Sequence, residues 1–381
     1  MNVDIRIAGG TVIDPERGLK GPGEVLIKGN QIVSPAQGEA VQAERTIDAE
    51  GCLVLPGLID FHTHLFAGGS EMGIYPDTSL LPMGVTTAVD AGSCGTANFE
   101  SFYRMVVATS RMRIFSFLNV CPAGLLTSRY HEEVDPKYYD EAGMEALFNR
   151  YPGQLLGLKI RQSKDIVGDL GCKPLEAAVA IAQRLACPVS VHTSNPPVSA
   201  EQLVSLLRPG DIYCHVHQGT GETILDPDGK VRPAMVAAQK AGIIFDAANG
   251  RNHFSVKIAQ PALAQSFFPD VISTDVTSRT VYGEFAFALP YVMMKYLNMG
   301  MALEQVIAAC TSTPARLMGR RGKIGTLAPG AFADVAVFRP AEKPVAIKDN
   351  FGNSITGNQW LLPQLTIADG KIAYRQIDFS M

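Results

Sequence analysis

The sequence predicts an α/β protein, a (β/α)₈ TIM-like barrel with a small β-sandwich domain built from both chain ends. In the middle of the chain, eight short apolar stretches alternate with stretches whose apolar residues recur at helical spacing. The middle is also close to the length of about 250 residues that is typical of such barrels. Both chain ends instead contain short alternating runs joined by glycine turns. We therefore expect residues 1–54 and 325–381 in the β-sandwich and residues 55–324 in the barrel.

The composition is that of a globular protein that binds small molecules. Of 381 residues, 46% are hydrophobic and 18% charged, and the net charge of −4 offers no basic surface for nucleic acid or an anionic membrane. No signal segment and no apolar run long enough to span a bilayer is visible. The seven cysteines are scattered without a CxxC pattern, which favours reduced thiols and a cytoplasmic location. The composition is also compatible with a homo-oligomer.

The chain ends carry turn signals between strand-like runs. Gly9-Gly10 interrupts the alternating run "DIRIAGGTVID", and Gly29-Asn30 separates two further runs. Near the other end, Asp369-Gly370 is a hairpin signal inside "LTIADGKIAYRQ". Because both ends have the same pattern of strand-like runs and turn signals, we expect them to pack together.

The middle of the chain contains the barrel strands. They are expected at residues 57–63, 86–92, 114–120, 155–160, 188–193, 211–217, 243–248 and 271–277. Segments such as "PLEAAVAIAQRLA" lie between them and are typical of helices. A doubly wound sheet is the alternative, but no GxGxxG follows a strand, and eight evenly spaced units favour closure.

Polar side chains follow five of these strands at the carboxyl end. They are His62 and His64, Lys159, His192, His215 and His217, and Asp275. Residues i and i+2 of a strand share a face, so the first two histidines point the same way. The carboxyl ends of barrel strands converge on the face where active sites lie. The sequence therefore predicts that these side chains meet.

Imidazoles and a carboxylate in one place indicate a divalent metal site, with Zn²⁺ as the default ion. His62, His64 and Asp275 would hold one ion, and His192 and His215 a second. A lysine ammonium cannot coordinate a metal, but a neutral amine can add CO₂ to form a carbamate whose two oxygens bridge two ions. Lys159 is therefore expected as an acquired carboxylate ligand. Two such ions can activate water and polarise a carbonyl.

These residues also carry a family resemblance. "LPGLIDFHTH", preceded by "TIDAEGCLV" and balanced near the end by "GKIGTLAPGAFADVAVF", resembles the amidohydrolase superfamily over nearly the whole chain. "MGVTTAVDAGS", "GLKIR" and "STDVTSR" are similar to its dihydroorotase-like subgroup of amidohydrolase/deacetylase enzymes. The resemblance implies a bridging carbamylated Lys159, a second metal on His192 and His215, and Asp275 doubling as general acid and base.

The activity that follows is hydrolysis of an ester or amide, with a deacetylase of small acetylated hydroxy or amino acids favoured. Asp275 would take a proton from the metal-activated water and return it to the leaving group. The alternatives are a cyclic-amide hydrolase of the dihydroorotase or hydantoinase type, an aminopurine deaminase, and a non-catalytic dihydroorotase-like assembly protein. Lys159 favours a binuclear hydrolase over a deaminase. All six ligands are present, which argues against the non-catalytic protein.

The substrate pocket is less defined by the sequence. Arg161 lies two residues beyond Lys159 and would either pair with a substrate carboxylate or form a salt bridge to a loop. "NGRNHFSV" departs from the histidine- and glycine-rich run that relatives carry after the seventh strand, and His217 stands where they usually have an aromatic residue. The candidate substrate-binding residues are Arg161, His217, Asn249, Arg251 and His253.

Overall fold

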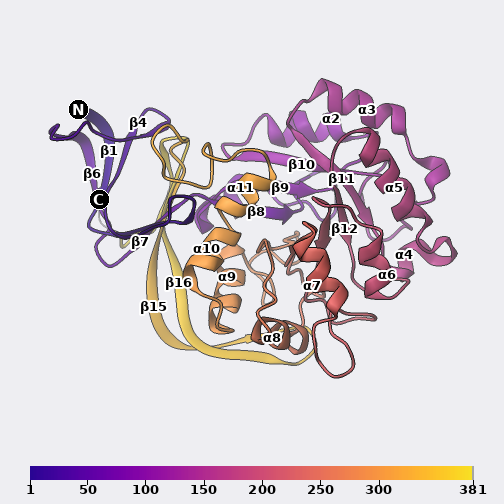
Figure 1. Ribbon diagram of the computed structural model, residues 1–381. Coiled ribbons are helices and arrows are strands. Elements are labelled where there is room, and N and C mark those ends of the chain that lie inside the picture. The colour runs from indigo at the N-terminus through magenta and orange to yellow at the C-terminus, as the bar shows by residue number, and fades with distance from the viewer. Residues whose placement is uncertain (380–381) are drawn as a thin grey trace.

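The computed structural model describes residues 1–379, which form three β-sheets flanked by helices (Figure 1). The largest sheet has seven parallel strands in the order β14-β13-β12-β11-β10-β9-β8. Its strands are β8 (Leu58–Thr63), β9 (Val85–Ala91), β10 (Arg113–Asn119), β11 (Leu155–Arg161), β12 (Val189–His192), β13 (Ile212–Cys214) and β14 (Ile244–Asp246). Seven of the eight predicted barrel strands are therefore confirmed.

The eighth predicted strand, 271–277, is present as single bridges. Val271 pairs with Asp246 of β14, and Val276 pairs with Thr63 of β8, both in parallel. This segment thus lies between the two edge strands of the curled sheet. A left-handed backbone conformation at Asp275 (φ 51°) interrupts the extended geometry that a regular strand needs.

Helices cover the outer face of the parallel sheet (Figure 1). In α5, for example, Leu175, Ala178 and Ala182 are buried at helical spacing against β11 and β12. The helices are α1 (Pro76–Ser79), α2 (Phe99–Phe102), α3 (Glu141–Arg150), α4 (Lys164–Val167), α5 (Lys173–Arg184), α6 (Ala200–Ser205), α7 (Pro233–Lys240), α8 (Val256–Ala264), α9 (Leu289–Asn298), α10 (Leu303–Ala309) and α11 (Ser312–Leu317). No helix within residues 1–379 is both long enough and apolar enough to cross a bilayer.

The two chain ends form the other sheets and share one apolar core. That core contains Ile7, Ile27 and Ile47 from the first and Val335 and Ile367 from the last part of the chain, which confirms that the ends pack together. The four-stranded sheet, in the order β5-β4-β1-β6, contains β1 (Asn2–Ala8), β4 (Val25–Lys28), β5 (Gln31–Val33) and β6 (Gln42–Asp48). The six-stranded sheet, in the order β17-β16-β15-β7-β2-β3, contains β2 (Thr11–Asp14), β3 (Leu19–Pro22), β7 (Leu53–Pro56), β15 (Val335–Lys348), β16 (Ser354–Ala368) and β17 (Lys371–Arg375).

Both predicted hairpin turns are present. Gly29-Asn30 joins the antiparallel strands β4 and β5, and Gly29 has a φ of 59°. Asp369-Gly370 joins β16 and β17, with φ values of 51° and 77°. Turns of two residues with positive φ match the twist of the strands that they connect.

The β15–β16 hairpin is much longer than the sequence pattern indicated. Its first part belongs to the six-stranded sheet, whereas its far part runs under α9 towards α8 (Figure 1). Ile347, Ile355 and Leu361 are buried there in the same apolar cluster as the helices that cover the parallel sheet. The hairpin therefore ties the chain-end sheets to the parallel sheet and its helices.

Candidate metal centre

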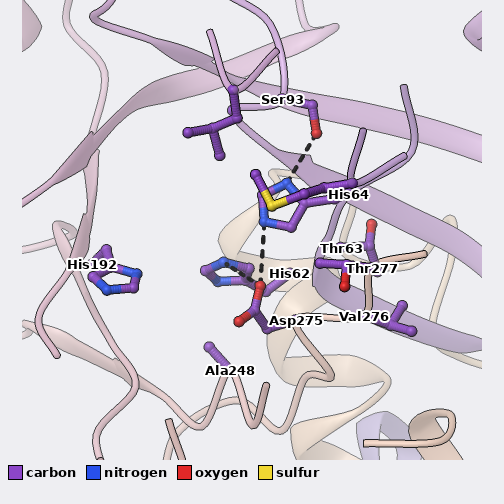
Figure 2. A network of polar contacts seen from close by, with 12 residues as sticks. His62, Thr63, His64, Ser93, His192, Ala248, Asp275, Val276 and Thr277 are labelled. Atoms are coloured by element: carbon purple, nitrogen blue, oxygen red, sulfur yellow. Dashed lines mark hydrogen bonds and ion pairs between the residues drawn. The ribbon is translucent and has the colours of Figure 1, made fainter. Parts of the chain in front are cut away.

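His62 and His64, from the end of β8, point to the same carboxylate (Figure 2). His64 Nε2 lies 3.2 Å and His62 Nε2 3.7 Å from Asp275 Oδ1. All three side chains are buried, and their ligand atoms are close enough to hold one metal ion. The structure thus brings together the residues predicted for the first ion.

His192 and His215 form a second group a short distance away. His192 Nδ1 lies 2.8 Å from His215 Nε2. His253 joins them: its ring centroid lies 4.3 Å from that of His215 and 4.8 Å from that of His192. The ligand atoms of the three histidines lie within 4.8 Å of one another, so the second group offers three nitrogens.

Lys159 lies beside both groups and is 1% exposed. Its Nζ is 3.1 Å from His62 Nε2 and 3.9 Å from Cys214 Sγ. Gly92 leaves room for the lysine stem, because a Cβ at this position would lie 2.6 Å from Lys159 Cβ. The predicted bridging lysine therefore reaches the centre from β11.

The other ring nitrogen of three of these histidines is already engaged. His62 Nδ1 lies 3.2 Å from Asp246 Oδ2, and His64 Nδ1 lies 2.9 Å from Ser93 Oγ. His215 Nδ1 lies 2.7 Å from the carbonyl oxygen of Ala248. These contacts leave Nε2 of each ring for the centre. Such outer partners fix the ring orientation of metal-ligating histidines, so the donor set fits a divalent metal site.

Burial sets the charge of the imidazoles. Desolvation lowers the pKa of His62, His192 and His215 well below the usual value, and neighbouring histidines and Lys159 add to the effect. They are therefore neutral at pH 7, the form that binds metals. Burial also raises the pKa of Asp246 to about 7, against hydrogen bonds from Ser273 and from the backbone N–H of Ala248.

The backbone at two of the candidate ligands is held in an unusual conformation. His215 (φ 63°) and Asp275 (φ 51°) lie in the left-handed region, which non-glycine residues seldom adopt and which often marks functional sites. Asp60 fixes the segment before Asp275, since its carboxyl group accepts hydrogen bonds from Thr274 N (3.0 Å) and Thr274 Oγ1 (2.7 Å).

A cavity of about 230 Å³ opens over the two groups. Arg161, Arg251 and His253 line it, as predicted for substrate-binding residues, and Arg279 also lines it. Arg161 Nη1 is held 3.1 Å from Glu132 Oε2, and His253 Nδ1 lies 2.7 Å from Ser194 Oγ.

The structure differs from the prediction at His217 and Asn249. The strand predicted at 211–217 ends at Cys214, and the left-handed His215 breaks the alternation that would have kept His217 beside it. His217 is instead fully buried, with Nδ1 2.9 Å from Tyr296 Oη. Asn249 is also buried, and its amide donates to the carbonyls of Gly250 and Phe285. Both side chains support the loops around the cavity.

Three residues that orient the candidate ligands were not given this role from the sequence. Asp246 holds His62, Ser93 holds His64, and Asp60 holds Thr274, next to Asp275. Asp246 could have been found, because it ends the seventh predicted strand in "IIFDAA", where the other site residues end theirs. Ser93 directly follows the second predicted strand, 86–92, in the same way. Asp60 lies inside the first predicted strand and carries no such signal.

Known proteins resemble this chain over nearly its full length. Models of the amidohydrolase family match residues 45–146 and 213–367. A protein named as a deacetylase from Agrobacterium fabrum is 33% identical over 335 residues, which cover 87% of this chain and 81% of that protein. A solved structure described as an adenine deaminase has a TM-score of 0.89 at 28% identity, covering 98% of this chain and 100% of its own. A second, described as a dihydroorotase, has a TM-score of 0.85 at 28% identity over 97% and 98%.

Proposed function

Because this chain belongs to the amidohydrolase family of metal-dependent hydrolases, we propose that it is a deacetylase of small acetylated hydroxy or amino acids. The observation that carries the proposal is the convergence of two groups of imidazoles on one lysine and one carboxylate beneath a single cavity. The relative named as a deacetylase supports the choice of acyl group.

The donor set supports two divalent ions with Zn²⁺ as the native metal. His62, His64 and Asp275 would hold one ion, and His192 and His215 the other. Lys159 would bridge them as its carbamate, formed from CO₂ and the neutral amine. Its position 3.1 Å from His62 Nε2 supports this role. When bound, the two ions supply an acidified water and polarise the acyl carbonyl.

The protein side chains would divide the remaining work. Asp275 Oδ1, next to both β8 histidines, would accept the proton of the attacking water and return it to the departing alkoxide or amine. Asp246, Ser93 and the Ala248 carbonyl would keep the imidazole rings oriented. Arg161 and Arg279 in the cavity lining already contact Glu132 and Glu71. Arg251 supports a carboxylate-bearing substrate, because a guanidinium pairs with a carboxylate through two parallel hydrogen bonds.

The test combines metal content with a substrate screen. The purified zinc-loaded enzyme should contain about two zinc ions per chain and hydrolyse members of a panel of O-acetyl hydroxy acids and N-acetyl amino acids. Lys159→Ala should lose zinc and activity together, whereas Lys164→Ala, on the exposed side of α4, should keep both. Turnover of dihydroorotate, hydantoins or adenine without turnover of the acetylated acids would overturn the deacetylase assignment.

The architecture around the site is also proposed in finer detail. Segment 271–276 would serve as the eighth strand of a closed barrel spanning residues 55–324, supported by its bridges to β8 and β14. Residues 1–54 and 325–381 would form the β-sandwich domain, supported by their shared core, although residues 380 and 381 lie outside the described part of the chain. The seven free cysteines support a cytoplasmic location.

A further inference from the structure

The tip of the β15–β16 hairpin, residues 349–353, lies against the loop that carries the substrate side of the cavity. This loop, residues 249–255, connects β14 to α8 and contains Arg251, Asn252 and His253, which line the cavity. Asp349 Oδ2 accepts a 2.9 Å hydrogen bond from the backbone N–H of Val256, where α8 begins. Asn350 Nδ2 donates a 2.6 Å hydrogen bond to Asn252 Oδ1.

The tip is itself a turn closed by hydrogen bonds. Asp349 is 4% exposed, and its Oδ1 accepts hydrogen bonds from Phe351 N (2.9 Å) and Asn353 N (2.8 Å). Burial alone would raise the pKa of Asp349, but hydrogen bonds from Asn353 and from the backbone N–H of Val256 hold it below the usual value. The carboxylate is therefore ionised at neutral pH and holds both the turn and the start of α8.

The hairpin is also fixed along its length. Asn298 of α9 accepts hydrogen bonds through Oδ1 from the backbone N–H groups of Asn358 and Gln359, both at 3.0 Å. At the base of the tip, Lys348 Nζ lies 3.2 Å from Glu284 Oε1, in the loop that follows segment 271–276. The tip is thus held against the barrel from two sides.

We propose that Asp349 and Asn350 are positioning residues for the substrate. They hold loop 249–255 so that Arg251 and His253 face the cavity. Among the residues that the structure describes, the cavity lining contains neither of them, so they act through the loop. The loop has no regular secondary structure that would fix it from within. The kinetic part of the test of this proposal rests on the proposed function, whereas the hydrogen-exchange part does not.

The experiment uses hydrogen exchange of the full-length zinc-loaded protein together with kinetics. Asn350→Ala and Asp349→Asn should speed amide exchange in residues 249–256 about fivefold, the effect of one lost hydrogen bond. With the best acetylated acid of the screen, KM should rise about three- to tenfold while kcat stays within about twofold, because all six proposed metal ligands lie outside loop 249–255. Zinc content should not change. Asn358→Ala, a matched substitution of an exposed side chain on β16, is the control and should resemble the unsubstituted protein.

The outcomes separate this proposal from the proposed function. Exchange and KM equal to those of Asn358→Ala would overturn the positioning role, and so would faster exchange spread evenly over the barrel. Faster exchange confined to residues 249–256, in a protein that hydrolyses none of the acetylated acids, would support the positioning role and overturn the deacetylase assignment.

Discussion

Gly92 is the residue that lets the lysine side chain enter the metal centre. It follows β9 with a φ of 81°, and a Cβ there would lie 2.6 Å from Cβ and Cγ of Lys159. A side chain would thus meet a steric clash as well as an unfavourable backbone conformation. Since the stem of the lysine cannot retreat into the packed barrel, its Nζ would have to move.

We predict that Gly92→Ala lowers zinc content and activity together. Gly38→Ala is the matched control, because Gly38 has a φ of 78° and no atom lies within 4 Å of the place that its Cβ would take. Both variants should lose about 1 kcal/mol or more of unfolding free energy from backbone strain, measured by urea titration. Zinc content, measured by elemental analysis, should fall only in Gly92→Ala. Equal zinc in the two variants would contradict the steric argument.

Asp246 acts on the first metal group through His62. Its Oδ2 lies 3.2 Å from His62 Nδ1, while Oδ1 accepts a hydrogen bond from Ser273 Oγ (2.5 Å). We predict that Asp246→Asn weakens zinc binding about ten- to a hundredfold, because outer-sphere carboxylates orient a ligating histidine and raise its basicity. Competition with a chromophoric chelator measures this affinity. Asp228→Asn, at an exposed turn, should bind zinc as the unsubstituted protein does. Unchanged affinity in Asp246→Asn would show that the ring is held by packing alone.

At the scale of elements, α9 carries a buried lysine that makes stability depend on pH. Lys295 Nζ donates to Asn249 Oδ1 (3.0 Å) and to the Phe285 carbonyl (2.6 Å). Burial lowers its pKa to about 7, with Asp349 opposing the shift. The unfolded chain, with a lysine pKa of about 10.4, therefore binds more protons than the folded chain between these two values.

The free energy of unfolding should accordingly gain a contribution that rises from about pH 7 to about pH 10 and is constant below that window. We predict that Lys295→Met, which has no proton to lose, lacks this rise. Urea unfolding at a series of pH values measures it, with the exposed Lys240→Met as the control for the loss of a lysine. If the free energy of unfolding changes with pH in the same way in Lys295→Met and Lys240→Met, burial does not lower the pKa of Lys295.

The elements also show what the sequence could predict. Seven barrel strands and both hairpin turns were predictable because alternation and glycine turn signals are local. The convergence of His62, His64 and Asp275 was predictable because barrel topology places strand ends on one face. The reach of the β15–β16 hairpin was not predictable, since it depends on contacts with α9 that lie 60 residues away in sequence. His217 points away from the site because His215 has a left-handed backbone conformation. The alternation of side chains along a predicted strand does not reveal such a change at a single residue.

At the scale of the whole molecule, the metal centre joins parts of the chain that are far apart in sequence. Its candidate ligands come from β8, β11, β12, the residue after β13, and segment 271–276. Ions that bind only the folded chain stabilise it by mass action, by about 4 kcal/mol for each site when free metal exceeds Kd a thousandfold. Without an ion, His192 and His215 present ring nitrogens to each other rather than to a carboxylate.

We therefore predict that removing the metal lowers the stability of the whole barrel. After chelation and dialysis, the urea midpoint of the barrel transition should fall, and returning Zn²⁺ should restore it. The slope with denaturant should stay the same, because the surface exposed on unfolding does not change. Circular dichroism in urea measures both quantities. Asp246→Asn provides the internal check. Because this variant should bind zinc more weakly, a fixed concentration of zinc should raise its urea midpoint less than that of the unsubstituted protein. An apo protein as stable as the zinc-loaded one would mean that the ions do not link these strands, and the proposed metal centre would then have to be abandoned.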